Sequence, residues 1–379
     1  MSNRFQAFDA VAVPGVQALS PYQPGKPESE LKREYGIEKI TKLASNENPL
    51  GCSKRVVKAV SEALADLTRY PDGAGFALKA AIAERHGLPA EMITLGSGSS
   101  EVIELVARVF VAPGDEVVFS QHAFAMYPII TQAVGGKAVE VPAKAWGHDL
   151  EAMLAAVNEK TRLMFVANPN NPTGTWLTRD ELHDFMARVP ERVVVVVDEA
   201  YFEYASDPNA GAEDYPDATQ WLTGFPNLVV TRTFSKAFGL AGLRVGYSLS
   251  SVVIADLMNR IRPPFNVNTP AQVAALTILS DTEYLQESLS TNVLGMAQMV
   301  KGFEQLNLDY IPSMGNFVCV EVGDEAGVVY DALLHQGVIV RPVANYGMPC
   351  HLRVSIGTEN ENLHFLSSLA TVLGRASAI

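Results

Sequence analysis

The sequence contains little cysteine. Its three cysteines, Cys52, Cys319 and Cys350, stand far apart along 379 residues and are odd in number. They do not make the paired framework of a disulfide-rich secreted domain, and their spacing matches no metal-ligand motif. We therefore expect no bound metal and a protein of the reducing cytoplasm.

The sequence also lacks long hydrophobic runs. No apolar stretch approaches the roughly 20 residues that a membrane-spanning helix needs. The N-terminal stretch MSNRFQAFDAVAVPG does not join a basic start to a long apolar segment, so it does not resemble a secretory signal. From these two absences we expect a protein that is not secreted and has no membrane partner.

Positive charge is in short supply. The chain has 29 Lys and Arg against 42 Asp and Glu, for a formal net charge of −13. A net-negative protein is a poor partner for nucleic acid, which is itself a polyanion. A small anionic ligand is still compatible with this balance, because a local cluster of arginines can outweigh the net charge.

Apolar side chains, in contrast, are plentiful. They make up 48% of the residues, enough to fill large cores, and the length suggests two domains. Apolar strands alternate with amphipathic helices over about 44–263, which predicts a doubly wound α/β domain. Five consecutive valines at 193–197 indicate a strand that is covered on both faces, as in a parallel sheet. The clearest strands are expected at 116–120, 162–168, 192–200 and 227–235.

A second, smaller α+β unit is expected after Pro263 and Pro264. A helical stretch over about 270–306 opens it, and a final helix over about 359–373 closes it, with Gly374 placed to end that helix. We expect a large domain at 44–264 and a small domain at 265–379. Residues 1–43 are expected to form an N-terminal arm and part of the small domain.

Prolines punctuate the first thirty residues, which favours an extended arm over a helix. We expect this arm to pack on the small unit or on a partner subunit. The prolines are Pro14, Pro21, Pro24 and Pro27.

Two loops at the ends of expected strands have features of ligand sites, and in an open α/β sheet ligands bind beyond the carboxyl ends of the strands. In LGSGSSEVIEL (95–105), glycines precede a helix that starts at Ser99 or Ser100, and free N–H groups there suit a phosphate. The loop NPNNPTG (168–174) presents the amide of Asn171. A common glycine turn and a well-formed proline turn are the alternative interpretations.

Two charged residues occupy similar positions. Asp198 follows the valine run, and a carboxylate there needs a positive partner or several donors, because an isolated buried charge is costly. Lys236 stands beside the hydroxyls of Thr233 and Ser235, with Arg244 eight positions later. The alternative for Asp198 is a helix cap or a structural ion pair, and the alternative for Lys236 is a solvated lysine. One ligand would use all four features, since pyridoxal 5′-phosphate carries a phosphate, a ring oxygen, a basic ring nitrogen and an aldehyde.

These motifs carry a family resemblance over nearly the whole chain. The sequence resembles the class I/II aminotransferases, which are pyridoxal-phosphate-dependent enzymes of fold type I. Within them, LSPYQPGKP and the C-terminal block resemble the subfamily that acts on histidinol phosphate. The motifs, in family order, are LSPYQPGKP (19–27), ASNENPLG (44–51), RYPDG (69–73), NPNNPTG, DEAY, TRTFSKAFGLAGLRVGY (231–247) and HLRVSIGTENEN (351–362).

The resemblance implies a fold and a reaction. The fold is a large, mostly parallel sheet domain with a smaller α+β domain. The reaction is the exchange of an amino group between L-histidinol phosphate, or its imidazole-acetol phosphate product, and the 2-oxoglutarate/glutamate pair in histidine biosynthesis. The resemblance further implies a homodimer with a shared active site.

The resemblance also implies roles for the cofactor-binding residues. Lys236 would bond covalently to the cofactor aldehyde and then move the substrate proton, and Asp198 would keep the ring nitrogen protonated. Asn171 and Tyr201 would hold the ring oxygen, and Phe124 would stack on the ring, with ordinary core packing as its alternative. The phosphate would be held by Ser99, Ser100, Thr233, Ser235, Arg244 and, from the neighbouring subunit, Tyr70. Relatives often carry Asp or Asn where this chain has Ser100, so only a backbone contact is carried over there.

For the substrate, the resemblance points to Arg353 and to Arg341 as binders of carboxylate or phosphate. Asn171 and Tyr22 match positions near the substrate. A surface salt bridge is the alternative for each arginine.

Three other functions remain open at this stage. An aminotransferase selective for aromatic amino acids would share every cofactor residue. A decarboxylase of a phosphorylated amino acid would use the same cofactor to break a different bond. A regulatory protein that binds the cofactor without turnover is disfavoured, because the arm is too short for a DNA-binding domain and the net charge is negative.

Overall fold

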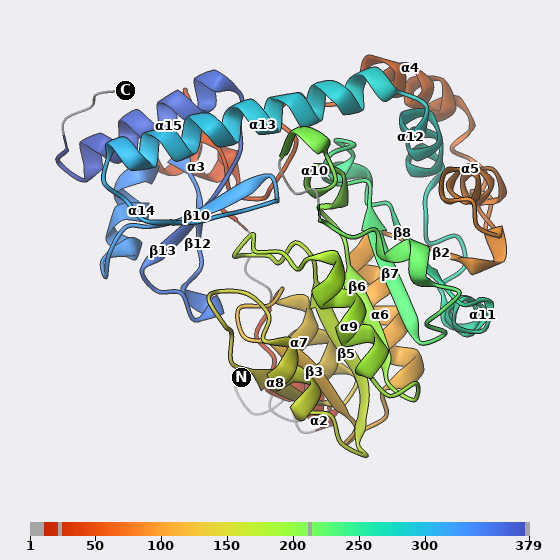
Figure 1. The fold of residues 1–379 in the computed structure, drawn as a ribbon. Helices are drawn as coiled ribbons and strands as arrows, with labels where there is room; N and C mark the ends of the chain where they lie inside the picture. Colours follow the sequence, from red (N-terminus) through yellow and green to blue (C-terminus); the bar gives the residue numbers. More distant parts are fainter. Residues whose placement is uncertain (1–10, 22–24, 211–213, 376–379) are drawn as a thin grey trace.

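The computed structural model describes residues 11–21, 25–210 and 214–375. The chain forms two units, each built on its own sheet, and the long helix α13 (Thr282–Gln305) runs from one to the other along the top of the molecule (Figure 1). Helices α4, α5 and α12 lie at the far end of α13 from the small unit (Figure 1).

The large unit is built on a sheet with the strand order β2-β8-β7-β6-β5-β3-β4. Neighbouring strands are parallel except around β8, which runs antiparallel to β7 and to β2. The predicted α/β fold with a mostly parallel sheet is therefore confirmed. The strands are β2 Ile93–Gly96, β3 Glu116–Ser120, β4 Lys137–Val141, β5 Thr161–Ala167, β6 Val194–Asp198, β7 Leu228–Thr233 and β8 Gly246–Ser250.

The valine run packs on both faces of this sheet, as predicted. Val194 and Val196 belong to the core under one helical layer, and Val195 and Val197 belong to the core under the other. Because side chains alternate along a strand, only a strand buried on both sides tolerates such a run. The first layer is α6 Ser99–Phe110, α7 Met126–Ala133 and α11 Val252–Ile261; the second is α4 Lys54–Ala63, α5 Phe76–His86, α8 Leu150–Ala155, α9 Arg179–Arg188 and α12 Thr269–Leu279.

The small unit has an antiparallel sheet of order β12-β13-β10-β9. A parallel pair joins β1 (Thr41–Lys42) to β11 (Val338–Ile339), so residues close to the N-terminus are part of this unit. The helix α15 starts at a capping box between Thr358 and Glu361 and is followed by Gly374 at φ 62°. The other elements are β9 Tyr310–Ile311, β10 Phe317–Glu321, β12 Arg341–Pro342, β13 His351–Ser355, α3 Glu28–Tyr35, α14 Ala326–His335 and α15 Glu359–Val372.

The structure adds detail to two sequence predictions about helices. The helical stretch expected over about 270–306 consists of two helices, α12 and α13, and Asp281 between them caps the start of α13. The N-terminal arm is not wholly extended: Pro14 starts the helical turn α2 (Pro14–Gln17), where its missing N–H has no helical partner to lose. That turn lies on the large unit, since a Cβ on Gly15 would come within 1.9 Å of the Gln132 carbonyl oxygen.

Short elements complete the chain. They are α10 Phe202–Ala205 and the 3-10 turns η1 Leu64–Asp66, η2 Ala90–Met92, η3 Pro208–Ala210, η4 Ala218–Trp221, η5 Ala241–Leu243 and η6 Ala344–Tyr346. In the described residues, no helix combines the length and the apolar character needed to cross a bilayer. All three cysteines are free.

Candidate active site

A cavity of about 260 Å³ opens beyond the carboxyl ends of β5, β6 and β7. The small unit supplies its opposite wall through β12 and β13. This cavity brings together side chains that were widely separated in the sequence. The predicted site residues that line it are Ser99, Ser100, Phe124, Asn171, Asp198, Tyr201, Thr233, Ser235, Lys236, Arg244, Arg341 and Arg353.

Lys236 lies in the turn after β7 and is partly buried. Its Nζ donates a hydrogen bond of 3.1 Å to the Ser45 carbonyl oxygen and lies 5.7 Å from the centre of the Tyr201 ring. Burial, followed by the positive charge of Arg353, lowers the pKa of Lys236 to about 7. The amine is therefore partly unprotonated at neutral pH, as a nucleophile must be.

Asp198 is the last residue of β6 and is buried. Its two oxygens accept hydrogen bonds from the hydroxyls of Tyr127 at 2.8 Å and Thr231 at 2.9 Å. Burial raises the pKa of Asp198, while these hydrogen bonds lower it. Both donors are neutral, so within the described residues no full positive charge is hydrogen-bonded to this carboxylate.

Tyr201 and Asn171 line the cavity near the lysine. The Tyr201 hydroxyl accepts a hydrogen bond of 2.9 Å from the Asn46 amide, and burial raises the pKa of Tyr201 to about 12. The hydroxyl stays protonated at neutral pH and can donate to a ligand oxygen. Asn171 accepts a hydrogen bond of 2.5 Å from Arg353 through Oδ1, which orients its amide NH₂.

One end of the cavity is suited to an anion. Ser99 and Ser100 start α6, where backbone N–H groups have no helical acceptor. Arg244 donates to the Ser235 hydroxyl at 3.2 Å. It also lies against Gly98, where a Cβ would come within 2.4 Å of the guanidinium. A glycine at φ 80° therefore lets the arginine reach the helix start.

The wall formed by the small unit carries two buried arginines. Arg341 on β12 pairs directly with Arg353 on β13 in the antiparallel register. Arg353 donates to the Ala44 carbonyl oxygen at 2.8 Å, while its buried Nε has no hydrogen-bond partner among the described residues. Buried polar groups are normally paired, so this Nε is an open donor in the site.

Two predicted residues are not part of this arrangement. Tyr70 is 81% exposed, does not line the cavity of its own chain, and stacks on Phe265 with ring centres 4.7 Å apart. Tyr22 lies outside the described residues.

Sequence reasoning assigned no role to three residues that contact the site. Thr231 is the direct neighbour of Asp198 in the parallel register of β6 and β7, so a strand alignment would have found it. Tyr127 stands three residues after Phe124 but is buried in the core, stacked on Phe165 at 4.4 Å. Asn46 lies in the quoted block ASNENPLG, where nothing local marks its contact with Tyr201.

The donor set fits one cofactor. Free N–H groups, hydroxyls and Arg244 suit a phosphate, Asp198 suits a protonated ring nitrogen, and the nucleophilic amine of Lys236 lines the same cavity. The fold and this cavity define an enzyme that works with pyridoxal 5′-phosphate. More narrowly, the chain belongs to the aminotransferase class I and II family, whose model matches residues 38–369.

Curated relatives cover nearly the whole chain. This chain is 57% identical over 371 residues to histidinol-phosphate aminotransferase 2 of Pseudomonas fluorescens. The alignment covers 97% of this chain and 99% of the relative. The chain is 58% identical over 368 residues to the enzyme of the same name in Pseudomonas aeruginosa, across 97% of this chain and 98% of the relative.

Solved structures share the fold. Histidinol-phosphate aminotransferase from Sinorhizobium meliloti, in complex with pyridoxal 5′-phosphate, superposes with a TM-score of 0.87 at 30% identity over 96% of this chain and 98% of that one. An aspartate aminotransferase variant from Thermus thermophilus has a TM-score of 0.81 at 23% identity, over 95% of this chain and 99% of that one.

Proposed function

We propose that this aminotransferase exchanges an amino group between L-histidinol phosphate and 2-oxoglutarate in histidine biosynthesis. One observation carries the choice of substrate: two buried arginines of the small unit, Arg341 and Arg353, line the same cavity as Lys236. Histidinol phosphate has no α-carboxylate but carries a phosphate, whereas glutamate carries two carboxylates. A planar guanidinium binds either anion in a bidentate manner.

Bound pyridoxal phosphate supplies an electron sink for the bond that is broken at the substrate carbon. Lys236 would hold the cofactor through its amine and would move the proton at the substrate carbon, because burial lowers the pKa of this amine to about 7. Asp198 would hold the proton on the ring nitrogen, Tyr201 and Asn171 would hold the ring oxygen, and Phe124 would pack on the ring.

The start of α6 would hold the phosphate of the cofactor. The backbone N–H groups of Ser99 and Ser100 and the hydroxyls of Thr233 and Ser235 would donate hydrogen bonds to it, and Arg244 would add a charge-assisted one. Arg244 is already directed there by its contact with Ser235 at 3.2 Å.

The working form is a homodimer in the cytoplasm. The dimer is supported by two exposed rings that stack on one another, Tyr70, which is 81% exposed, and Phe265, which is 42% exposed. A contiguous exposed apolar patch favours a protein–protein interface. Tyr70 would then reach the phosphate end of the partner's cavity, and Tyr22 the substrate.

Purified protein with pyridoxal phosphate, glutamate and imidazole-acetol phosphate should release 2-oxoglutarate. Lys236→Ala should abolish turnover and the visible absorbance of the protein-bound cofactor. A Lys236→Ala variant that still transaminates would refute the role of this lysine. Comparing kcat/KM for histidinol phosphate and phenylalanine tests the substrate, since a preference for phenylalanine would place the enzyme with the aromatic aminotransferases.

A further inference from the structure

The segment 44–46 lines the cavity of Lys236 on its way from β1 of the small unit to α4 of the large unit. Its first two residues use backbone carbonyl oxygens, which accept hydrogen bonds from Arg353 at 2.8 Å and from Lys236 at 3.1 Å. The third residue, Asn46, uses its side chain, whose amide donates to the Tyr201 hydroxyl at 2.9 Å. A substitution at Asn46 can therefore remove one contact with the site and leave the two backbone contacts in place.

Asn46 is held from several sides. It is 1% exposed, and its backbone is left-handed at φ 54°. Its N–H donates to the Ser355 hydroxyl at 2.8 Å, and its carbonyl oxygen accepts a hydrogen bond from the Asn316 amide at 3.0 Å. Its Oδ1 accepts a hydrogen bond from the same Ser355 hydroxyl at 3.1 Å. A buried residue with so many fixed partners has one position and one side-chain orientation.

The contacts with Ser355 decide which end of the Asn46 amide faces Tyr201. A serine hydroxyl has a single hydrogen, and this one is donated to Oδ1, so the oxygen end faces Ser355 and the NH₂ end faces the phenol. The phenol oxygen thus accepts from Asn46, and its own hydrogen is left to donate into the cavity that Tyr201 lines. In the opposite orientation, the amide oxygen would compete for that hydrogen.

We propose that Asn46 is a positioning residue that, anchored by Ser355, turns the Tyr201 hydroxyl so that its hydrogen is donated to the ring oxygen of the bound cofactor. This inference rests on the role proposed above for Tyr201 and adds the residue that gives the phenol its direction. A phenol both donates and accepts, so burial alone does not choose the direction. The amide of Asn46 makes that choice, because it can only donate to the phenol.

The absorbance of the holoenzyme tests the proposal without any measurement of turnover. The visible absorbance of the bound cofactor changes with pH, and a hydroxyl that donates to the ring oxygen stabilises negative charge there and lowers the midpoint of that change. Tyr201→Phe should raise the midpoint by about 1 to 2 pH units, the size expected for one hydrogen bond to a charged group.

Asn46→Gly removes the amide and tolerates the left-handed backbone. It should raise the midpoint by about 0.5 to 1 unit, because the phenol is then free to turn away from the ring oxygen. Ser355→Ala removes the anchor of Oδ1 and should give a smaller shift in the same direction. This second variant keeps the test decisive if Asn46→Gly does not retain the cofactor.

The double variant Asn46→Gly/Tyr201→Phe separates positioning from a general loosening of the site. If Asn46 acts through the phenol, Asn46→Gly adds no further shift once the phenol oxygen is gone. If Asn46 merely holds the two units together, the two shifts add.

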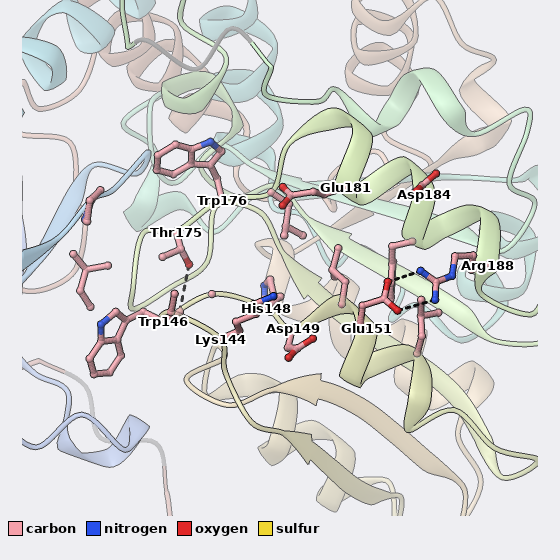
Figure 2. Close-up of a pocket in the computed structure, with 18 residues that line it drawn as sticks. Lys144, Trp146, His148, Asp149, Glu151, Thr175, Trp176, Glu181, Asp184 and Arg188 are labelled. Atoms are coloured by element: carbon pink, nitrogen blue, oxygen red, sulfur yellow. Dashed lines mark hydrogen bonds and ion pairs between the residues drawn. The ribbon is translucent and has the colours of Figure 1, made fainter.

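Two controls match the structural part of the change. Asn316→Ala removes the hydrogen bond to the Asn46 carbonyl oxygen but leaves the side-chain contacts. Trp146→Leu removes another contact between the large unit and β13, where the indole meets the edge of His351 with ring centres 4.9 Å apart. Trp146 lines a separate cavity of about 610 Å³, none of whose residues lines the cavity of Lys236 (Figure 2). Both controls should lower the unfolding free energy in urea and leave the midpoint unchanged.

The proposal is overturned if Asn46→Gly keeps the wild-type midpoint, if its shift adds in full to that of Tyr201→Phe, or if the two controls move the midpoint as far. A wild-type midpoint in Tyr201→Phe would overturn the role of Tyr201 as well. Amino-group exchange between histidinol phosphate and 2-oxoglutarate by the unchanged enzyme is a separate measurement. Its failure would contradict the proposed function, whatever the midpoints are.

Discussion

Two adjacent acids at the end of β6 differ in how their charge is balanced. Asp198 faces the cavity and receives hydrogen bonds from the neutral hydroxyls of Tyr127 and Thr231. Glu199 is also buried, but it pairs with the guanidinium of Arg232 at 2.5 Å. The charge of Glu199 is balanced by a cation of the protein itself. Asp198 is stabilised only by hydroxyl dipoles and lines the cavity, where it can pair with a positively charged group of a ligand.

Arg232 shows what a structural ion pair needs in this core. It is 2% exposed, contacts Asp217 at 2.9 Å as well as Glu199, and lies 3.3 Å from the centre of the Phe202 ring. A buried charge is tolerated when a charge of opposite sign and hydrogen-bonding groups surround it. The two acids thus differ in their partners: Glu199 is paired with a buried guanidinium, and Asp198 receives hydrogen bonds from neutral hydroxyls only.

The largest effect is expected on the structural side of this comparison. Glu199→Gln leaves Arg232 buried with Asp217 alone, and breaking a buried pair typically costs about 3–5 kcal/mol of unfolding free energy. Urea unfolding measures the loss, and the absorbance of the bound cofactor should be retained. Asp217→Asn is the milder control, because the Asp217 side chain is 31% exposed. If Glu199→Gln kept the wild-type unfolding free energy but no longer bound the cofactor, Glu199 would be a cofactor residue and not a structural one.

Asp198→Asn should have the opposite profile. We expect kcat to fall about 10²- to 10³-fold, the size usually seen when one electrostatic partner of a reaction is removed. The unfolding free energy should change by no more than about 1 kcal/mol, because the amide is neutral and keeps hydrogen-bonding partners in Tyr127 and Thr231. A stability loss as large as that of Glu199→Gln would show that Asp198 is structural too.

The two hydroxyls that hold Asp198 offer a finer test. Tyr127→Phe keeps the stacking on Phe165 and removes one hydrogen bond to the carboxylate, and Thr231→Val removes the other. A hydrogen bond to a charged group is worth about 1.5–3 kcal/mol, so each change should lower kcat about 10- to 100-fold.

The spectrum and its pH dependence show whether these hydroxyls act through the cofactor. In both variants the absorbance change of the bound cofactor with pH should shift relative to wild type. Thr131→Val is the control, since it removes a buried hydroxyl of α7 that makes no hydrogen bond to the described residues. Equal losses in Thr131→Val would mean that the hydroxyls only support packing.

The smallest effect concerns the two buried cations. Arg232 stays charged at any working pH, whereas the pKa of Lys236 is lowered to about 7, and a lowered pKa favours the neutral amine above that pH. The rate at which apoprotein takes up pyridoxal phosphate should therefore rise about tenfold from pH 6 to pH 8 and then level off. Arg353→Gln removes a nearby positive charge and should move the midpoint of this rise upward; an unchanged midpoint would contradict the assignment.

The stability of the apoprotein should follow the same titration. The pKa of Lys236 is lower in the folded state than in the unfolded chain, so the unfolded chain binds more protons between about pH 7 and the ordinary lysine range. The unfolding free energy contributed by this group should rise with pH across that window.

Much of the fold was open to prediction because its signals are local. The valine run indicated a strand buried on both faces, and the alternating cores that contain Val195 and Val196 confirm it. The apolar pattern indicated helical structure over about 270–306, but the cap at Asp281, which separates α12 from α13, was not used in that prediction. The turn α2 was missed because proline in the first turn of a helix looks the same as proline in an extended arm.

The site was predictable to the extent that its residues follow strands. Lys236, Asp198 and Asn171 were found because the carboxyl ends of neighbouring strands meet at one edge of a sheet. Tyr127 was not found, since its contact with Asp198 bridges 71 positions and its sequence neighbours are ordinary core residues.

The sequence by itself determined the class of chemistry, because a lysine among hydroxyls, an acid after a buried strand and a glycine turn before a helix are local patterns with local physical reasons. Only the tertiary structure decided that Asp198, the last residue of β6, is open to a ligand, and that Glu199, the next residue, is paired with Arg232. Side chains at consecutive positions of an extended chain point to opposite faces of the sheet. The groups that meet each side chain on its face come from distant parts of the sequence.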